Sequence, residues 1–327
     1  MNRSSVALVG ISNAIVDVLC HVQPEFVQDL GAPPGSMTLI DRDQAVSLYD
    51  RMGPAVESAG GSVANTVACF ASLDGSAGYI GRVAEDQLGR IFDHDMTSIG
   101  VDTRLKPETR QAPTARCHVL ITPDGERTMQ TYLGACVEIA PTDITEQSCG
   151  DADIVLLEGY VWDTPEGPES MAEAVRIAKA NGNRVALSLS DSFCVERHHA
   201  AFSALSNAGA DIVIGNEAEM KALFEVATFD EAQAAAAANG RLFVMTRSEL
   251  GSVIVQGNDV AEQAADAIDQ VIDSTGAGDA YVAGCLYAIS QGHSLAAAAR
   301  LGTSCATLAI QQVGARPQPT ALRALID

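Results

Sequence analysis

The sequence is poor in positive charge, and in lysine above all. Its 327 residues hold 20 Lys and Arg against 42 Asp and Glu, a net charge of −22, and its only lysines are Lys106, Lys179 and Lys221. A nucleic-acid backbone or an anionic membrane attracts basic side chains and disfavours an acidic surface. The composition therefore argues against both as partners. An anionic small molecule would have to be bound by backbone N–H groups or by a few arginines.

Metal-binding and membrane signals are also missing. The eight cysteines form no Cys-x-x-Cys pair, and neither they nor the six histidines show a zinc-ligand spacing. We expect the cysteines to be small buried hydrophobic residues in a reducing compartment. No run approaches the roughly 18 apolar residues of a membrane span, and the first residues contain only a short apolar run. A cytoplasmic protein is the expectation.

Short apolar runs alternate with longer amphipathic segments along most of the chain. We expect strands at residues 6–9, 79–80, 154–157, 185–189, 212–214 and 242–245. We expect helices at residues 63–72, 87–99, 169–181, 200–208, 217–224 and 231–239. Such alternation predicts an α/β fold with a mostly parallel sheet covered by helices on both faces, and ligands bind at the carboxyl ends of such strands.

Two segments interrupt this alternation. Residues 13–54 show partial strand periodicity, and residues 106–134 contain two β-like runs, 115–122 and 127–133, joined by a Pro-Asp-Gly turn. We predict that both segments form an inserted β-rich lid, and that residues 1–12, 55–105 and 135–327 form the α/β core. The alternative is a pair of decorating loops without a lid role.

The segment Asp273-Ser-Thr-Gly-Ala-Gly-Asp279 carries the strongest chemical signal. We expect it to connect the end of an apolar strand at residues 270–272 to a helix. Glycines at that turn let successive N–H groups point at an anion at the helix N-terminus. A carboxylate there can accept a hydroxyl proton while the N–H groups stabilise a transferred phosphoryl group. The alternative is an ordinary glycine turn with a hydroxyl N-cap. The segment matches neither a P-loop nor a dinucleotide fingerprint.

This segment resembles the carboxy-terminal signature of the ribokinase-like, phosphofructokinase-B type carbohydrate kinases. The amino-terminal signature of that family is similar to Ser58-Ala-Gly-Gly-Ser-Val-Ala-Asn65, and the resemblance extends over essentially the whole chain. Residues 10–17, 35–38, 132–135 and 187–190 are most similar to the adenosine kinase branch. The resemblance implies a ribokinase-like three-layer α/β/α fold with a small β-rich lid.

The resemblance also implies roles near the signature. Asp279 would be the base that deprotonates the acceptor hydroxyl, and Gly276, Ala277 and Gly278 would form the anion hole. Asp273 would either help to hold a monovalent cation such as K⁺ or simply cap the turn.

The acceptor is expected at two other segments. Gly60 and Gly61 let the backbone approach a sugar, and Asn65 offers a donor and an acceptor to a hydroxyl group. Asn13 and Asp17 suit a vicinal diol, because each hydroxyl can both donate and accept. The alternatives are a simple glycine loop, an Asn turn and a lone strand carboxylate.

The nucleotide side rests on five further residues. Asn216 and Glu219 form a capping-box pattern, and in the family the matching motif arranges Mg²⁺ through water. Thr246 and Ser248 match a Thr-x-Gly pattern that contacts nucleotide phosphates, with Ser in place of Gly. Arg127 either reaches a phosphate when the lid closes or lies on the surface. The segment 302–314 lines the adenine pocket in the family.

These observations predict an ATP- and Mg²⁺-dependent kinase that phosphorylates a primary hydroxyl of a nucleoside, with adenosine as the first choice. A kinase for a free sugar, such as ribose, fructose or a keto-deoxy sugar acid, is the alternative. A non-catalytic ligand-binding protein on the same fold is a more distant one. The partners expected are small molecules, and the protein is expected to be a monomer or a homodimer.

Overall fold

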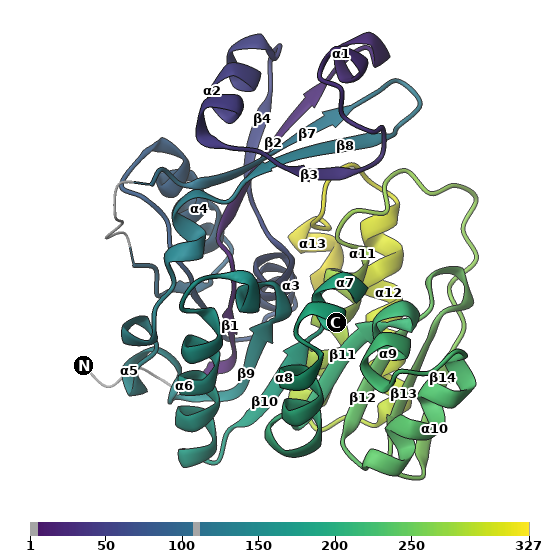
Figure 1. Ribbon diagram of the computed structural model, residues 1–327. Coiled ribbons are helices and arrows are strands. Elements are labelled where there is room, and N and C mark those ends of the chain that lie inside the picture. The colour runs from purple at the N-terminus through teal and green to yellow at the C-terminus, as the bar shows by residue number, and fades with distance from the viewer. Residues whose placement is uncertain (1–5, 107–111, 327) are drawn as a thin grey trace.

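The computed structural model describes residues 6–106 and 112–326, and its centre is a nine-stranded sheet (Figure 1). The strand order is β14-β13-β12-β11-β10-β9-β1-β5-β6. Neighbouring strands from β12 to β6 are parallel, whereas β13 pairs antiparallel with both β12 and β14 at one edge. The strands are β1 (Val6–Ile11), β5 (Ala77–Ile80), β6 (Asp102–Thr103), β9 (Ala152–Glu158), β10 (Arg184–Ser188), β11 (Ile212–Asn216), β12 (Leu242–Thr246), β13 (Ser252–Gln256) and β14 (Asp259–Gln263).

Helices cover both faces of this sheet, so the core has three layers. One apolar cluster fills the interface between one sheet face and the helices α3 (Ser62–Ser72), α4 (Gln87–Ser98), α11 (Ala277–Ser290), α12 (Leu295–Ile310) and α13 (Pro319–Arg323). A second cluster lies under α5 (Glu146–Cys149), α6 (Gly167–Ala180), α7 (Ser192–Arg197), α8 (His199–Ala204), α9 (Glu217–Phe224) and α10 (Phe229–Asn239). All eight cysteines are buried and unpaired, as the sequence predicted.

A second, five-stranded sheet lies beside this core, at the top of Figure 1. Its order is β3-β8-β7-β2-β4, with β2 (Ile15–His21), β3 (Met37–Leu39), β4 (Val56–Gly60), β7 (Ala115–Ile121) and β8 (Arg127–Tyr132). Helices α1 (Pro24–Asp29) and α2 (Arg42–Arg51) lie on the side away from the core. Along β2 the buried residues alternate with half-buried ones that line a cavity, as the period of two requires.

The predicted elements and the observed ones agree in type along most of the chain, and the ribokinase-like α/β fold is confirmed. The helix predicted at residues 200–208 is shorter, because α8 ends at Ala204 and a π-helical turn, Leu205–Gly209, follows. The small sheet also extends past the predicted lid boundary at residue 54, since β4 pairs with β2. The division into core and lid domains itself stays a prediction.

The strand predicted at residues 270–272 is wrong. Val271 and Ile272 are 53% and 52% exposed, and neither residue belongs to a strand of the two sheets. The N–H of Ile272 instead donates to the carbonyl oxygen of Ile310 at the end of α12, which ties an irregular segment to a helix. Among the described residues, no helix is both long and apolar enough to cross a lipid bilayer.

Candidate active site

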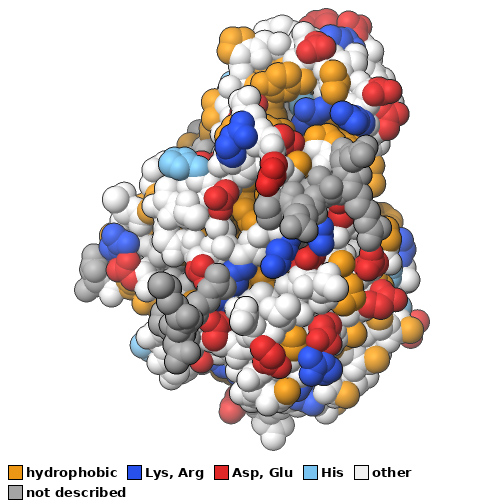
Figure 2. Space-filling view, turned by 90° about the vertical axis from the view of Figure 1, so that its left-hand side faces the viewer, with side chains coloured by type: hydrophobic (Ala, Val, Ile, Leu, Met, Phe, Trp, Pro, Cys, Tyr) orange, Lys and Arg blue, Asp and Glu red, His pale blue; other side chains and the backbone are white. Residues whose placement is uncertain are grey.

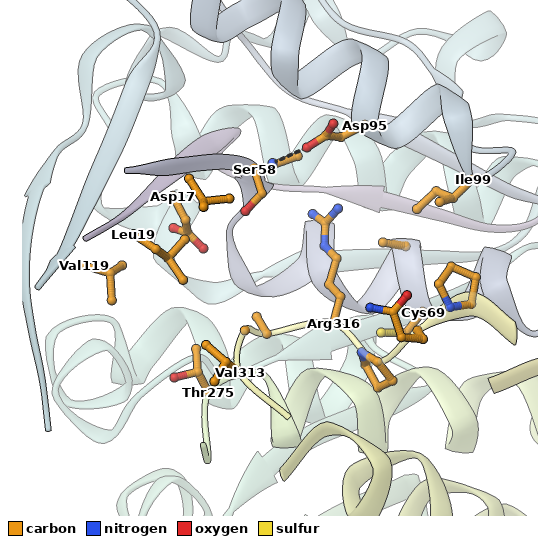
Figure 3. Close-up of a pocket in the computed structure, with 18 of the residues that line it drawn as sticks. Asp17, Leu19, Ser58, Cys69, Asp95, Ile99, Val119, Thr275, Val313 and Arg316 are labelled. Atoms are coloured by element: carbon orange, nitrogen blue, oxygen red, sulfur yellow. Dashed lines mark hydrogen bonds between the residues drawn. The ribbon is translucent and has the colours of Figure 1, made fainter. Parts of the chain in front are cut away.

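The loop that runs from Asp273 to Asp279 separates two cavities. Thr275 lines a cavity of about 680 Å³ between the small sheet and the core, which we call the acceptor cavity (Figure 3). Ser274, Ala277 and Gly278 line a second cavity of about 760 Å³ over β12, α11 and α12, which we call the nucleotide cavity. One short loop therefore borders both spaces, and α11 begins where they meet.

The loop has the geometry of an anion cradle at a helix N-terminus. Gly276 is the N-cap of α11 and has a φ of 73°, in the left-handed region that favours glycine. A Cβ there would lie 2.6 Å from the Cα of Ala315, so a side chain would also clash. The N–H of Ala277 makes a long turn bond of 3.3 Å to the carbonyl oxygen of Ser274. The N–H groups of Gly278 and Asp279 have no partner among the described residues, as expected for the first turn of a helix.

Asp279 stands in this first turn, and its carboxylate is held by α3. The hydroxyl of Ser62 donates to Oδ1 at 2.6 Å, and the amide nitrogen of Asn65 donates to Oδ2 at 3.1 Å. Burial raises the pKa of Asp279 to about 6, although both hydrogen bonds and the charge of Arg316 lower it. A carboxylate with a pKa near the working pH is suited to general-base catalysis.

Asp17 lies on the small sheet and lines the acceptor cavity. Burial raises its pKa to about 6, while Arg316 and Arg127 lower it. A Cβ at Gly60 would lie 2.7 Å from Oδ1 of Asp17, so this close approach of strand and carboxylate requires glycine. Gly61 has a φ of 94°, which is again a left-handed conformation.

Asn13 sits at the end of β1, with a side-chain oxygen that is buried and has no hydrogen-bond partner among the described residues. Its backbone N–H donates to Oε2 of Glu158 at 2.9 Å, and the N–H of Val63 donates to Oε1 at 3.3 Å. Glu158 thereby joins the segment of Asn13 to the start of α3. Burial raises the pKa of this carboxyl group to about 7. An unsatisfied buried acceptor is costly unless a bound group donates to it.

One part of the wall of the acceptor cavity is apolar. The small sheet contributes Leu19, Val119, Ile121 and Met129, and the segment after α12 contributes Val313. An apolar wall of this extent suits a flat, weakly hydrated group rather than the hydroxyls of a sugar.

The nucleotide cavity contains Asn216, Thr246 and Ser248. Asn216 is the N-cap of α9 and forms the predicted capping box with Glu219, whose backbone N–H donates to Oδ1 at 3.0 Å. Burial raises the pKa of Glu219 to about 7. A cation in the adjacent cavity would hold this carboxyl group ionised, so the pair fits Mg²⁺ bound through water. Ser248 has a φ of 51°, which explains why glycine is the usual residue of this pattern.

Arg127 and Asp273 make a contact that the sequence did not suggest. They form an ion pair that connects β8 of the small sheet to the loop. Asp273 also accepts hydrogen bonds from the N–H of Thr275 at 3.0 Å and from the N–H of Gly314 at 2.7 Å. The bond from Thr275 matches the turn-capping alternative for Asp273, and a role of this residue in holding a monovalent cation stays a prediction.

Sequence reasoning missed Ser62, Glu158 and Arg316. Glu158 ends an apolar strand at the sheet edge where ligands bind, and that position was a usable signal. Arg316 follows α12 and donates from Nε to Oδ1 of Asn65 at 2.8 Å, 251 positions earlier in the chain.

On the face shown in Figure 2, Asp and Glu side chains lie on both the small-sheet region and the core, and Lys and Arg side chains lie in small separate groups.

A buried carboxylate beside the N-terminus of a helix, at a loop that borders two cavities, is the arrangement expected of a phosphotransferase that acts on an alcohol. The comparisons agree, because the pfkB family carbohydrate kinase model matches residues 36–321. This chain belongs to the pfkB family of carbohydrate kinases.

The chain is similar to several characterised and solved relatives. It is 44% identical to the adenosine kinase structure from Sinorhizobium meliloti, with a TM-score of 0.91 and 99% of each chain covered. It is 41% identical to a probable sugar kinase structure from Rhizobium etli, with a TM-score of 0.91 and 99% and 98% covered. It is 28% identical to the ATP-dependent ribose-1-phosphate kinase of Halopiger xanaduensis, over 81% of this chain and 84% of that protein.

Proposed function

We propose that this protein transfers the γ-phosphoryl group of ATP to the primary hydroxyl of a nucleoside, with adenosine as the acceptor. The observation that carries the proposal is the position of Asp279 beside the loop that borders both cavities. The 44% identity to an adenosine kinase and the apolar wall of the acceptor cavity support a nucleoside.

In the proposed reaction, the acceptor hydroxyl gives its proton to Asp279 and its oxygen attacks the γ-phosphorus, so that ADP leaves. The N–H groups of Gly278 and Asp279 stabilise the charge on the transferred phosphoryl group, together with the positive end of α11. Asn216 and Glu219 would hold Mg²⁺ through water, and the positive charge of the ion would neutralise charge on the phosphates. Thr246 and Ser248 bind the nucleotide at the end of β12.

The acceptor binds between the small sheet and α3 in this proposal. Asp17, Asn13 and Asn65 take the ribose hydroxyls, and the glycines at 60 and 61 let the backbone approach them. The base packs against the apolar wall formed by Leu19, Val119 and Val313. Arg127 connects the small sheet to the loop and is placed to meet a phosphate if it leaves Asp273.

A free-sugar kinase is the second candidate, because one relative is a probable sugar kinase and another acts on ribose-1-phosphate. A coupled assay of ADP release across adenosine, other nucleosides, ribose and fructose separates the two. Turnover of adenosine at micromolar concentration supports the proposal. Turnover of a free sugar alone would overturn the nucleoside assignment and keep the kinase.

Asp279→Asn tests the base. We expect kcat to fall by about 10²–10⁴-fold while ATP-analogue binding, measured by calorimetry, stays unchanged. Asp230→Asn, at an exposed carboxylate in the first turn of α10, is the matched control and should leave kcat unchanged. Wild-type turnover in Asp279→Asn would remove this residue as the base.

Three expectations from the sequence remain proposals. We propose that the protein works in the cytoplasm, as a monomer or a homodimer, and any potassium dependence has to be tested by exchanging K⁺ for Na⁺ in the assay. Sedimentation velocity at micromolar concentration decides the oligomeric state.

A further inference from the structure

Arg316 is a guanidinium at the acceptor cavity that forms no ion pair with the described residues (Figure 3). Its hydrogen bond from Nε to Oδ1 of Asn65 is 2.8 Å long, and its Nη2 is buried without a partner. Burial lowers its pKa, yet an arginine stays protonated at any ordinary pH. Arg316 is half-buried and lines the cavity, and a buried N–H group without a partner is costly, so this position points to a role in the site.

The contact with Asn65 fixes the orientation of that amide. A guanidinium has only donors, so it must face the carbonyl oxygen of the amide. The NH₂ group of Asn65 then points the other way, toward Oδ2 of Asp279 at 3.1 Å. With the amide reversed, two oxygens would face each other and the hydrogen bond to the base would be lost.

We propose that Arg316 is a positioning residue that acts on Asp279 through Asn65, keeping the carboxylate aimed at the acceptor hydroxyl and ionised. The proposal rests on the proposed role of Asp279 as the base, but it does not depend on which alcohol is the acceptor. The path from Arg316 to Asn65 to Asp279 is a continuous chain of two hydrogen bonds.

The surroundings of Asp279 make this contact important. Burial raises the pKa of Asp17 and that of Glu158, and the negative charge of Asp279 adds to both shifts, so Asp279 repels each of these two carboxylates. Arg316 is the cation whose charge lowers the pKa of Asp279. The titratable and charged groups that interact with Asp279 or Arg316 are Asp17 on β2, Cys69 on α3, Tyr79 on β5, Asp95 on α4 and Glu158 on β9. Loss of Arg316 should therefore raise the pKa of Asp279, by removing both a charge and a fixed donor.

A double-mutant cycle tests the path. Arg316→Met should lower kcat/KM by about 10–10²-fold, because a small displacement of a catalytic group has effects of that size. In an Asn65→Ala background the same substitution should lower kcat/KM by less than about fivefold, because the hydrogen-bonded path is already gone and only the direct effect of the charge on Asp279 remains. If the two effects multiply instead, Arg316 acts on the acceptor directly and the proposal fails.

The pKa of Asp279, measured by titration, distinguishes a positioning role of Arg316 from a merely structural one, because loss of a structural contact alone would leave this pKa unchanged. In protein labelled with carboxyl-¹³C aspartate, the resonance lost in Asp279→Asn identifies the group, and Arg316→Met should shift its titration to higher pH. Arg316→Lys keeps the charge and a donor and should restore most of the wild-type titration, whereas Arg316→Gln should not. An unchanged titration in Arg316→Met would overturn the proposal.

The two proposals fail in distinguishable ways. If the wild-type enzyme phosphorylates no alcohol, the proposed function fails, while the titration of Asp279 still tests Arg316. Arg323→Met, which removes an arginine paired with Asp74 on the surface, is the matched control for charge and should change neither rate nor titration. Where Arg316→Met does not fold, shown by circular dichroism, Arg316→Gln and Arg316→Lys carry the comparison.

Discussion

Replacing Gly276 with alanine tests two features of the anion cradle, namely the left-handed backbone conformation of Gly276 and its close packing against Ala315. The substitution has two costs. A residue with a Cβ at a φ of 73° is destabilised by about 1–2 kcal/mol, and overlap with the backbone of Ala315 adds about 1–3 kcal/mol, as overpacking usually does. We therefore expect Gly276→Ala to lower the free energy of unfolding by about 2–5 kcal/mol.

The chain offers a matched control for the first cost alone. Gly292 follows α11, has a φ of 75°, and has nothing within 4 Å of an added Cβ. Gly292→Ala should lose only the conformational cost of about 1–2 kcal/mol and keep full activity. Urea unfolding of both variants, followed by circular dichroism, gives the difference that belongs to the contact with Ala315.

Activity is the decisive measurement. Gly276→Ala must move the loop by several tenths of an ångström, and a displaced oxyanion donor lowers kcat by about 10²–10³-fold. The measurement is kcat at saturating ATP, at a temperature where the variant is folded. Activity within about threefold of wild type, in a variant that has lost the stability predicted above, would falsify the cradle as the site of phosphoryl transfer.

The remaining predictions concern protonation and backbone conformation. The pKa of Asp279 is raised to about 6 and the base must be ionised, so kcat/KM should fall as pH falls through about 6; a pH profile that is flat down to pH 4.5 contradicts this. Glu158 has a pKa raised to about 7, so its protonated form is favoured in the folded state and its contribution to stability is lost as pH rises from about 4.5 through 7. The unfolding free energy of Glu158→Gln relative to wild type should therefore increase over that range, as measured by denaturant titration at pH 5 and pH 8. Ser248→Gly should raise the unfolding free energy by up to about 1 kcal/mol, because Ser248 has a φ of 51°, and ATP binding should not weaken; a loss of stability would show that the serine side chain stabilises the turn.

Local signals predicted the elements that local interactions determine. The predicted capping box at Asn216 begins α9 in the structure, because a side chain that satisfies the first free N–H groups marks a helix start in the sequence itself. The apolar runs of the central strands were predictable for the same reason, since burial on both faces leaves no polar position.

Contacts between distant segments could not be predicted in this way. The bond from Arg316 to Asn65 joins the two ends of the chain, and no local pattern marks either residue as a partner of the other. The pair Val271 and Ile272 misled for the opposite reason. Two apolar residues form a strand only if they pair with a neighbouring strand, and neither Val271 nor Ile272 belongs to a strand of the two sheets.

The site carries a cost that the fold has to offset. Asp17, Glu158 and Asp279 are titratable groups that burial holds above their usual pKa, and each is more easily ionised in an unfolded chain. Two apolar clusters on the faces of the large sheet supply stability that does not depend on pH. These carboxyl groups lie on β2, at the end of β9 and in the first turn of α11, outside both apolar clusters, so a change in their protonation leaves the packing of the core intact. Asp279 is held by the hydroxyl of Ser62 and the amide of Asn65, and its carboxylate must be ionised before it can accept the proton of the acceptor hydroxyl.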